Sequence, residues 1–173
     1  MTIPETYLLD SNVFIEAKRR YYAFNICPGF WDALVVHAEN STIKSIDRIK
    51  TFELQEGHVD DELKIWASTI ISSKFFAISN EEDVLLKYAE IMAWVNSQPR
   101  FFPFAIAEFA SSVDGWLIAY AKAKELILVT HEGRRPESKR SVMIPDVCDA
   151  IGVRCVDTFQ MLQALHTQFI LQR

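Results

Sequence analysis

The sequence predicts an α/β fold, a three-layer sandwich in which helices cover both faces of a central parallel sheet. Two short apolar runs, residues 6–9 and 126–130, have the length and aliphatic character of buried strands. Each is followed directly or within a few positions by an acidic residue, Asp10 or Glu132. Sequence with helical periodicity lies between the runs, as a parallel sheet requires. We therefore expect both acids at the carboxyl edge of one sheet, where open α/β sheets bind ligands.

Length and composition indicate one compact unit. The chain has 173 residues, of which 50% are hydrophobic, with six prolines and five glycines. We expect a single domain over residues 1–173 with a real hydrophobic core. The sequence begins without a basic leader and an apolar stretch, and no apolar run reaches the roughly 20 residues that span a bilayer. It thus predicts a cytoplasmic protein that makes no membrane contact.

Charge and cysteine content restrict the function further. A formal net charge of −5 argues against a protein that coats nucleic acid without specificity, because such binding grows with the number of phosphates neutralised. Basic residues gather at positions 18–20, 44–50 and 134–140, each either a solvated face or a local phosphate contact. The three cysteines show neither a CxxC pair nor zinc-like spacing, which predicts reduced thiols.

The first third of the chain is expected to alternate strands and helices. After the opening strand comes a short helix over residues 13–17, and a simple capping role for Asp10, Ser11 or Asn12 at its start remains open. The next expected elements are a helix at 30–38, a brief strand at 41–44 and a helix that begins at Ser45 and covers 46–55.

The position of Glu53 in that last helix is informative. Ile46, Ile49 and Glu53 stand at i, i+3 and i+7, which predicts that the carboxylate shares a stripe with two isoleucines. A carboxylate that faces a core needs compensation. Either a metal ion or a buried salt bridge to a nearby arginine would supply it.

The middle of the chain is expected to be mainly helical. An aromatic segment at 101–109, which includes the weaker candidate acid Glu108, is interpreted as core or as a partner surface. The other expected features are a turn at 56–61, Asp60 or Asp61 as the cap of a helix at 62–71, a short apolar segment at 75–78, and Ser79 or Asn80 as the cap of a helix at 82–95.

Asp114 is the second landmark. With Leu117, Ile118 and Ala121 it follows the i, i+3, i+4, i+7 pattern, so it begins the buried stripe of a helix and lies at the positive end of that helix. A plain N-cap role is the alternative. After the strand at 126–130 we expect a polar loop at 134–140, a short helix at 146–151 ended by Gly152, a strand at 153–156, a closing helix at 159–171, and caps at Asp146 and Asp157.

Carboxylates without a histidine or thiol cluster favour magnesium or manganese over zinc or copper. Several acids in one place repel one another unless a cation neutralises them. Such a cation lowers the pKa of a bound water and stabilises charge on a phosphodiester, which a metal-dependent nuclease requires. The chain contains no GxxxxGK, GxGxxG or GxSxG motif, so the common nucleotide-binding and hydrolase alternatives are disfavoured.

The motifs resemble those of the PIN domain family. The resemblance covers nearly the whole chain and rests on residues 8–15, the helical Glu53, residues 114–121 and residues 130–132, in the family's order. It implies a parallel sheet between helices and a ribonuclease that acts on single-stranded or structured RNA with Mg²⁺ or Mn²⁺. Many bacterial PIN proteins are toxins neutralised by a cognate antitoxin, which implies an antitoxin partner.

Carried over by position, the resemblance implies specific site residues. Asp10, Glu53 and Asp114 would be the metal-binding and catalytic acids, and Glu132 the fourth. Asn12 and Thr130 would support them by hydrogen bonding. The family often has Asp after the threonine of the fourth motif, whereas this chain has a single Glu followed by Gly. Compared with a minimal PIN toxin, the chain also carries extra helical material at about residues 60–98.

Three function classes follow. The first is the metal-dependent endoribonuclease, plausibly a toxin. The second is a catalytically weak or inactive PIN-like scaffold that binds RNA or a protein partner. The third is a small phosphatase or phosphotransferase with Asp10 as nucleophile, which is disfavoured because Asn12 stands where a second aspartate is usual. Aromatic residues at 101–104 also make a homodimer or antitoxin groove plausible.

Overall fold

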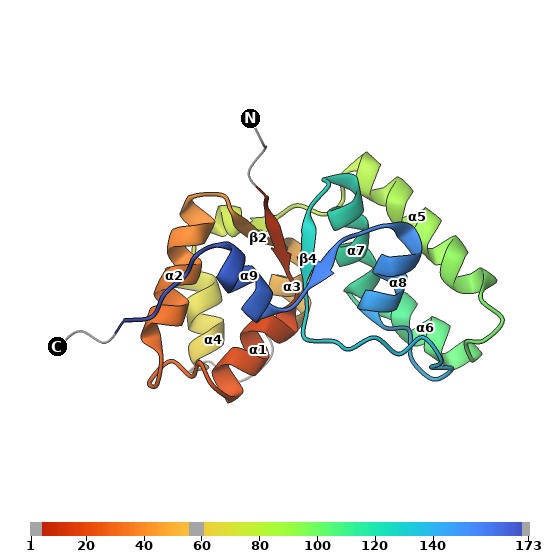
Figure 1. The fold of residues 1–173 in the computed structure, drawn as a ribbon. Helices are drawn as coiled ribbons and strands as arrows, with labels where there is room; N and C mark the ends of the chain where they lie inside the picture. Colours follow the sequence, from red (N-terminus) through yellow and green to blue (C-terminus); the bar gives the residue numbers. More distant parts are fainter. Residues whose placement is uncertain (1–4, 56–60, 171–173) are drawn as a thin grey trace.

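The computed structural model describes residues 5–55 and 61–170, and a parallel sheet forms its centre (Figure 1). The strands are β1 (Tyr7–Leu9), β2 (Ile43–Ile46), β3 (Phe76–Ala77), β4 (Ile127–Val129) and β5 (Cys155–Val156). They form one five-stranded sheet in the order β3-β2-β1-β4-β5. Every neighbouring pair is parallel, which confirms the predicted fold class.

The first strand occupies the middle of the sheet. Tyr7 is aligned with Ile43 of β2 on one side and with Ile127 of β4 on the other. All three residues of β1 and all three of β4 are buried, as continuous apolar strands in a covered parallel sheet should be. Because β1 and β4 run in the same direction, Asp10 and Thr130 emerge beside each other at the carboxyl edge.

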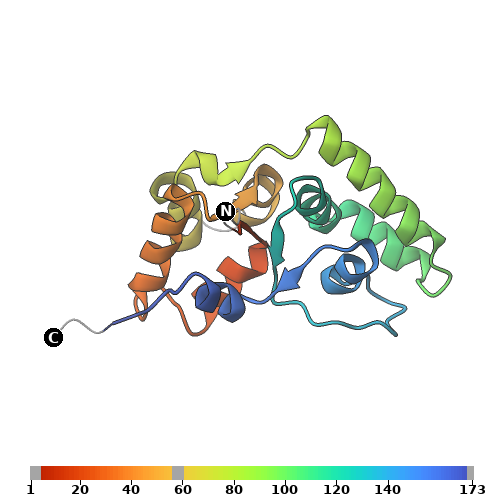
Figure 2. The ribbon, with the colours of Figure 1, turned by 45° about the horizontal axis from the view of Figure 1, so that its top comes forward.

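Helices cover the sheet from two sides. Figures 1 and 2 both show α1, α2, α4 and α9 as one group and α5 to α8 as the other, with the sheet between them. The helical segments are α1 (Ser11–Arg19), α2 (Pro28–Glu39), α3 (Asp47–Ile49), η1 (Lys50–Leu54), α4 (Glu62–Ile65), η2 (Trp66–Ile70), η3 (Ser73–Phe75), α5 (Glu82–Ser97), α6 (Pro103–Ser111), α7 (Asp114–Ala123), α8 (Ile144–Ile151) and α9 (Thr158–Ala164).

The segment around Ser45 differs from the prediction. β2 continues through Ser45 and Ile46, so both belong to the sheet and not to a helix. Both are fully buried, and Ser45 donates its hydroxyl hydrogen to the Leu9 carbonyl oxygen at 2.8 Å. Pairing with β1 and β3 stabilises the longer strand. The helix that follows is a single turn, α3, which continues as the π-helix η1.

Several helix ends were predicted correctly. Asp61 caps α4, Asp157 caps α9 through a capping box with Gln160, and Gly152 ends α8 in the left-handed conformation at φ 72°. Asp60 and most of the predicted turn at 56–61 lie outside the described residues. The predicted helix at 62–71 is divided into α4 and the π-helix η2.

Other predicted caps and bounds were wrong. Glu81, and neither Ser79 nor Asn80, is the N-cap of α5. Ser79 instead donates to a carboxylate oxygen of Asp47 at 2.6 Å, an interaction between distant segments that sequence periodicity does not reveal. The N-cap of α8 is Met143 and not Asp146. The closing helix α9 begins at Thr158 and ends at Ala164, well before position 171, which lies outside the described residues.

The aromatic segment at 101–109 is divided between core and surface. Phe101 and Phe109 are buried, whereas Phe102 and Phe104 are exposed with their ring centroids 5.7 Å apart. The exposed surface available to a partner is therefore the start of α6 and not the whole segment. Among the described residues, no helix is long and apolar enough to cross a membrane.

Candidate active site

Asp10 lies at the point where β1 ends and α1 begins. Its side chain is 5% exposed, and each carboxylate oxygen accepts a hydrogen bond. Oδ1 accepts from the Ser11 backbone N–H at 2.7 Å, and Oδ2 accepts from the Thr130 hydroxyl at 2.8 Å. Asp10 is thus the N-cap of α1 and, at the same time, part of a buried contact with β4. The capping and site interpretations of the sequence do not exclude each other.

Thr130 and Asn12 connect Asp10 to the loop after β4. The Asn12 amide donates to Thr130 Oγ1 at 3.0 Å, and Asn12 Oδ1 accepts from the His131 backbone N–H at 3.0 Å. The Glu132 backbone N–H also donates to Thr130 Oγ1, at 3.1 Å. Thr130 therefore accepts two hydrogen bonds and donates its own hydrogen to Asp10. This network fixes the direction in which the chain leaves β4.

Glu132 is held on its other side by α8. Its Oε2 accepts from the backbone N–H of Ile144, the first residue of that helix, at 2.8 Å. Burial raises the pKa of Glu132 to about 6, and the negative charge of Asp114 adds to this effect, while the Ile144 hydrogen bond opposes it. The fold thus holds Glu132 in position and raises its pKa above that of a solvent-exposed glutamate.

Asp114 is the first residue of α7 and is not its N-cap, which is Val113. The Asp114 backbone N–H donates to the hydroxyl of Ser112 at 3.3 Å. Burial raises the pKa of the Asp114 carboxyl, and the charge of Glu108 contributes, whereas a hydrogen bond with Ser112 lowers it. Glu108 thus influences the site through its charge from α6.

Glu53 reaches the site from the π-helix η1. The predicted stripe of Ile46, Ile49 and Glu53 is wrong, because Ile46 is a strand residue and η1 has i→i+5 hydrogen bonding instead of the 3.6-residue α-helical period. Glu53 is half-buried, while its neighbour Leu54 is buried. Its carboxylate still lies near enough to Asp10 to affect the pKa of that residue.

The four predicted acids lie close enough to interact electrostatically. Burial raises the pKa of Asp10 well above its ordinary value, and the charges of Asp114, Glu53 and Glu132 raise it further, while the Thr130 hydrogen bond lowers it. The four carboxyl groups thus form a region of concentrated negative charge at the carboxyl edge of the sheet.

The donor chemistry of this region fits Mg²⁺ or Mn²⁺, since carboxylate oxygens are the ligands these hard cations prefer. A cation would also relieve the repulsion that raises the Asp10 pKa. Within residues 5–55 and 61–170, however, no three His, Cys, Asp or Glu side chains stand close enough to hold a metal ion as they are. Metal binding would therefore need side chains to move closer together.

Three contributors to the site were not predicted from the sequence. His131 supplies a backbone N–H to Asn12, and the buried Ser45 hydroxyl binds the carbonyl of the last residue of β1. The guanidinium of Arg48 stacks on the Trp116 ring, 3.8 Å from its centroid, and its Nε donates to Ser79 at 3.1 Å. This stack joins the segment before Glu53 to the helix that begins at Asp114.

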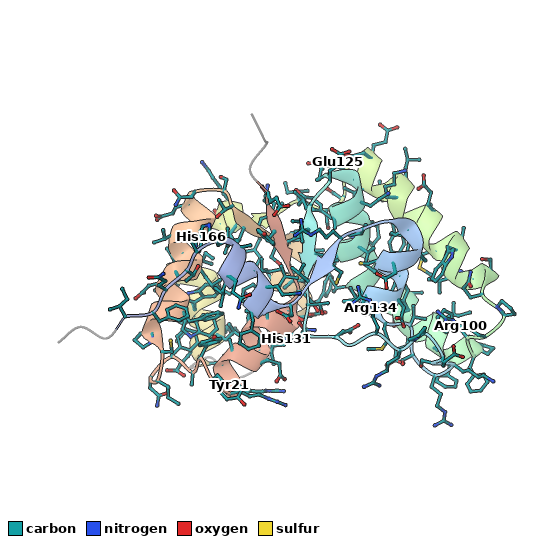
Figure 3. The ribbon with its side chains drawn as sticks, viewed as in Figure 1. Tyr21, Arg100, Glu125, His131, Arg134 and His166 are labelled. Atoms are coloured by element: carbon teal, nitrogen blue, oxygen red, sulfur yellow. The ribbon has the colours of Figure 1, made fainter. Side chains whose placement is uncertain are left out.

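Three residues of the predicted basic clusters form ion pairs. Lys18 pairs with Asp61, Arg20 with Glu16, and Arg134 with Asp149. Figure 3 shows His131 near the end of the sheet, between the two helical groups, and Arg134 beside α8. Arg135 is the basic residue whose charge lowers the pKa of Glu132, so it lies beside the acidic region.

Comparison with known proteins gives a family and two similar structures. A family model described as "Domain of unknown function (DUF4411)" matches residues 7–169. No curated protein matches the sequence. The crystal structure of FitAcB from Neisseria gonorrhoeae is similar at a TM-score of 0.52 and 19% identity, over 87% of this chain and 96% of that one. FitAB bound to an IR36 DNA fragment gives 0.51 and 18%, over 88% and 94%. The similarity supports a PIN-like fold.

Proposed function

The chain belongs to the DUF4411 family, and for this member we propose a metal-dependent endoribonuclease activity that requires Mg²⁺ or Mn²⁺. The observation that carries the proposal is that three carboxylates from separate elements, Asp114, Glu53 and Glu132, lie close enough to the buried Asp10 for their charges to raise its pKa. Burying like charges together lowers stability, so an arrangement of this kind is retained more readily where a cation and a reaction use it.

The four acids have distinct roles in this proposal. A bound cation would lower the pKa of an attacking water and stabilise charge on the phosphodiester. Asp10 supplies two carboxylate oxygens in a fixed orientation, because Ser11 and Thr130 each donate a hydrogen bond to one of them. Asp114, Glu53 and Glu132 would complete the oxygen donor set from the other elements.

Calorimetric titration with MnCl₂ tests this assignment directly. The wild type should bind Mn²⁺, and Asp114→Asn should lose that binding while its circular dichroism stays the same. Asp32→Asn is the matched control, because Asp32 is an exposed aspartate of α2 outside the acidic region. Equal Mn²⁺ binding by the wild type and Asp114→Asn would show that the metal site is elsewhere.

A non-catalytic scaffold is the second candidate. It is favoured by the finding that, among the described residues, no three potential ligands are already within metal-binding range. Glu132 is also tied to the Ile144 N–H, which restrains it from moving toward the other acids. A folded wild type that binds RNA, does not bind Mn²⁺ or Mg²⁺ and leaves RNA uncut would establish this alternative.

We further propose that the chain is the toxin of a toxin–antitoxin pair, acting in the cytoplasm. This rests on the PIN resemblance and agrees with the similar fold of FitAB, which was solved bound to a DNA fragment. A net charge of −5 disfavours DNA binding by this chain alone, so we assign any DNA contact to an antitoxin partner. Induced expression should stop bacterial growth, and Asp10→Asn should restore it. Undiminished growth arrest with Asp10→Asn would contradict this role.

A homodimer is part of the same proposal. The exposed Phe102 and Phe104 at the start of α6 provide an apolar contact of the kind found at interfaces. Light scattering at increasing protein concentration measures the oligomeric state. A mass that stays monomeric throughout would contradict the homodimer.

A further inference from the structure

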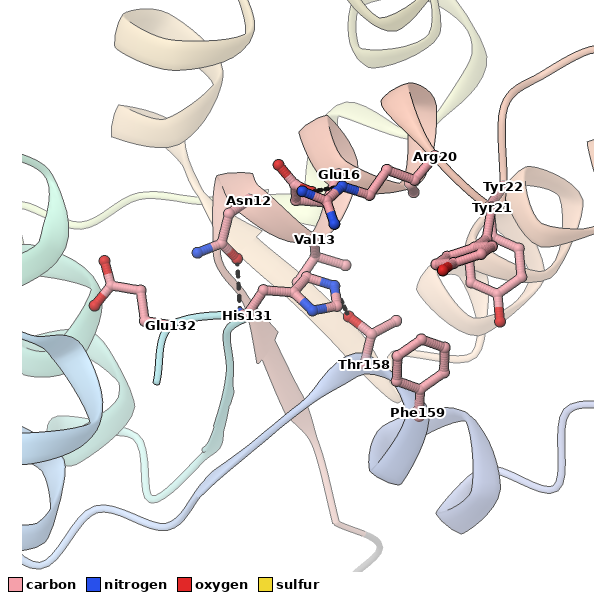
Figure 4. Close-up of a pocket in the computed structure, with 11 residues that line it drawn as sticks. Asn12, Val13, Glu16, Arg20, Tyr21, Tyr22, His131, Glu132, Thr158 and Phe159 are labelled. Carbon is pink, nitrogen blue, oxygen red and sulfur yellow. Dashed lines mark hydrogen bonds and ion pairs between the residues drawn. The ribbon is translucent and has the colours of Figure 1, made fainter. Parts of the chain in front are cut away.

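A cavity of about 460 Å³ opens beside the acidic region (Figure 4). It lies between α1, the loop after β4 and the start of α9. Asn12, His131 and Glu132 line the side nearest the acids, and Arg20, Tyr21, Tyr22 and Phe159 line the other side. Its volume is within the range of pockets that bind small molecules, about 300–1,000 Å³.

The cavity adjoins the candidate active site through shared residues. Glu132 belongs to the acidic region and also lines the cavity. Asn12 lines the cavity and donates to Thr130, the residue that donates to Asp10. A polymer whose backbone crosses the acids would therefore have its next unit in position to enter this cavity.

The far wall is aromatic and accessible. Tyr21 is 76% exposed and Phe159 is 47% exposed, so neither ring is needed to fill the core. Tyr22 is different, because it stacks on the buried Phe30 with ring centroids 4.5 Å apart and so forms a fixed floor. Exposed aromatic rings are the platforms on which the bases of single-stranded nucleic acids stack.

The polar side of the cavity is pre-organised. His131 Nε2 is 2.8 Å from the Thr158 hydroxyl, and its ring lies edge-on to Phe159 with centroids 6.2 Å apart. The ring therefore has a fixed orientation before any ligand enters. A flat heteroaromatic ligand would find one stacking wall and one hydrogen-bonding wall.

Arg20 and Glu16 form an ion pair at the rim of the cavity, and both residues line it. The Arg20 Nε lies 2.7 Å from a Glu16 carboxylate oxygen, while the arginine side chain remains 68% exposed. A guanidinium has five N–H donors, so the nitrogens that Glu16 does not engage can donate to a phosphate. The exposed aromatic wall together with these exposed donors fits a nucleotide.

We propose that this cavity binds the base of the nucleotide next to the scissile phosphate of a single-stranded RNA, with Tyr21 as the stacking residue and Arg20 as a contact to the flanking phosphate. The inference rests on the proposed ribonuclease function and assigns it a base-binding subsite. In this proposal the cavity positions the RNA and determines the preference among bases, and the acids do neither.

The first test measures RNA binding separately from cleavage. Fluorescein-labelled 12-nucleotide oligo(A), oligo(U) and oligo(C) are titrated with wild type, Tyr21→Ala and Tyr21→Phe in EDTA, with fluorescence anisotropy as the readout. Tyr21→Ala should weaken binding by about 5- to 150-fold, the contribution of one stacked base. Tyr21→Phe should bind as the wild type does, because the ring is retained.

The control variant is Leu86→Ala, which removes another exposed apolar side chain, on α5 and outside the cavity lining. It should bind all three RNAs with the wild-type affinity. Melting curves establish that both variants are folded. If Tyr21→Ala then binds RNA with the wild-type affinity, the subsite is overturned, and a side chain of a protein partner becomes the favoured occupant of the cavity.

Cleavage of the same oligonucleotides in Mn²⁺ separates the two proposals. If the wild type cuts RNA, Asp10→Asn does not, and Tyr21→Ala cuts and binds as the wild type does, the ribonuclease function stands and the subsite fails. If the wild type neither binds nor cuts any of the three RNAs, both proposals fail. Weaker binding by Tyr21→Ala together with a changed preference among the three RNAs supports the subsite.

Discussion

The two sides of the acidic region are built differently. On the β1–β4 side, Asp10, Asn12 and Thr130 form a continuous hydrogen-bonded network between two central strands. On the other side, Glu53 is carried by a π-helix that follows a single turn of α-helix. One side is thus fixed by the sheet, and the other depends on an irregular helix. We therefore expect the first side to contribute more to the orientation of the site than the second.

The largest expected difference between the two sides is in catalysis. Asp10→Asn should lower RNA cleavage by more than about 100-fold, beyond the 10–100-fold that loss of a supporting residue typically costs. Glu53→Gln should lower it by only about 10–100-fold, because Glu53 is half-buried whereas Asp10 is buried between two central strands. Initial rates at saturating Mn²⁺ compare the two variants. Equal losses would show that both sides position the reaction equally.

Removal of one hydroxyl on each side should affect stability unequally. Thr130→Val leaves the Asn12 amide and the Glu132 N–H without their acceptor, and should cost about 2–3 kcal/mol of the free energy of unfolding. Thr51→Val is the matched control on the Glu53 side. Thr51 is exposed and donates to the Asp47 carbonyl of its own helix, so the cost should stay below about 0.5 kcal/mol. Urea denaturation measures the free energy of unfolding of both variants. Similar losses would contradict the expected difference between the two sides.

The pKa of Glu132 predicts how stability depends on pH. Burial raises this pKa from 4.5 to about 6 in the folded chain. Between these values the folded state keeps a proton that the unfolded state has lost, so the stabilising contribution is full below pH 4.5 and is lost as the pH rises through 6. Glu132→Gln keeps an acceptor for the Ile144 N–H but carries no charge.

Glu132→Gln should therefore match the wild type at pH 4 and be more stable by at most about 2 kcal/mol at pH 8. Chemical denaturation at the two pH values tests this. Glu39→Gln, an exposed glutamate at the end of α2, is the control and should show no such gain. The contradicting result is a Glu132→Gln variant that is less stable than the wild type at pH 8.

The smallest effect is expected at the stack that joins the two sides. Arg48→Lys loses the planar contact with Trp116 and the hydrogen bond to Ser79, and should cost about 1 kcal/mol of stability. Arg19→Lys, at an exposed position of α1, should cost nothing measurable. Thermal unfolding of the two variants provides the comparison. An equal loss of stability in both variants would show that the stack does not stabilise the contact between the two segments.

The sequence was most informative where a strand ends on a polar residue. The positions of Asp10 and Thr130 follow from apolar runs of strand length, and Asp114 follows from a regular helical stripe. These patterns depend on local burial alone, which periodicity records directly. For the same reason the parallel sheet could be predicted from the two runs and the helices between them.

The parts that could not be predicted depend on distant contacts. Ser45 is a residue type that often begins a helix, but pairing with β1 and β3 keeps it in a strand. Glu53 lies on a π-helix, to which a 3.6-residue pattern does not apply. The hydrogen bond from Thr130 to Asp10 joins positions 120 residues apart, so no local pattern contains it.

That separation also has a consequence for the synthesis of the protein. β1 acquires its neighbour β4 only after the intervening 120 residues have been made. At about 5–20 residues per second, this takes about 6–24 seconds. A growing chain therefore exposes Asp10 long before Thr130, Asp114 and Glu132 exist, and it has no assembled site during that time. The order in which the residues are joined therefore keeps the proposed nuclease activity from appearing while the ribosome is still extending the chain.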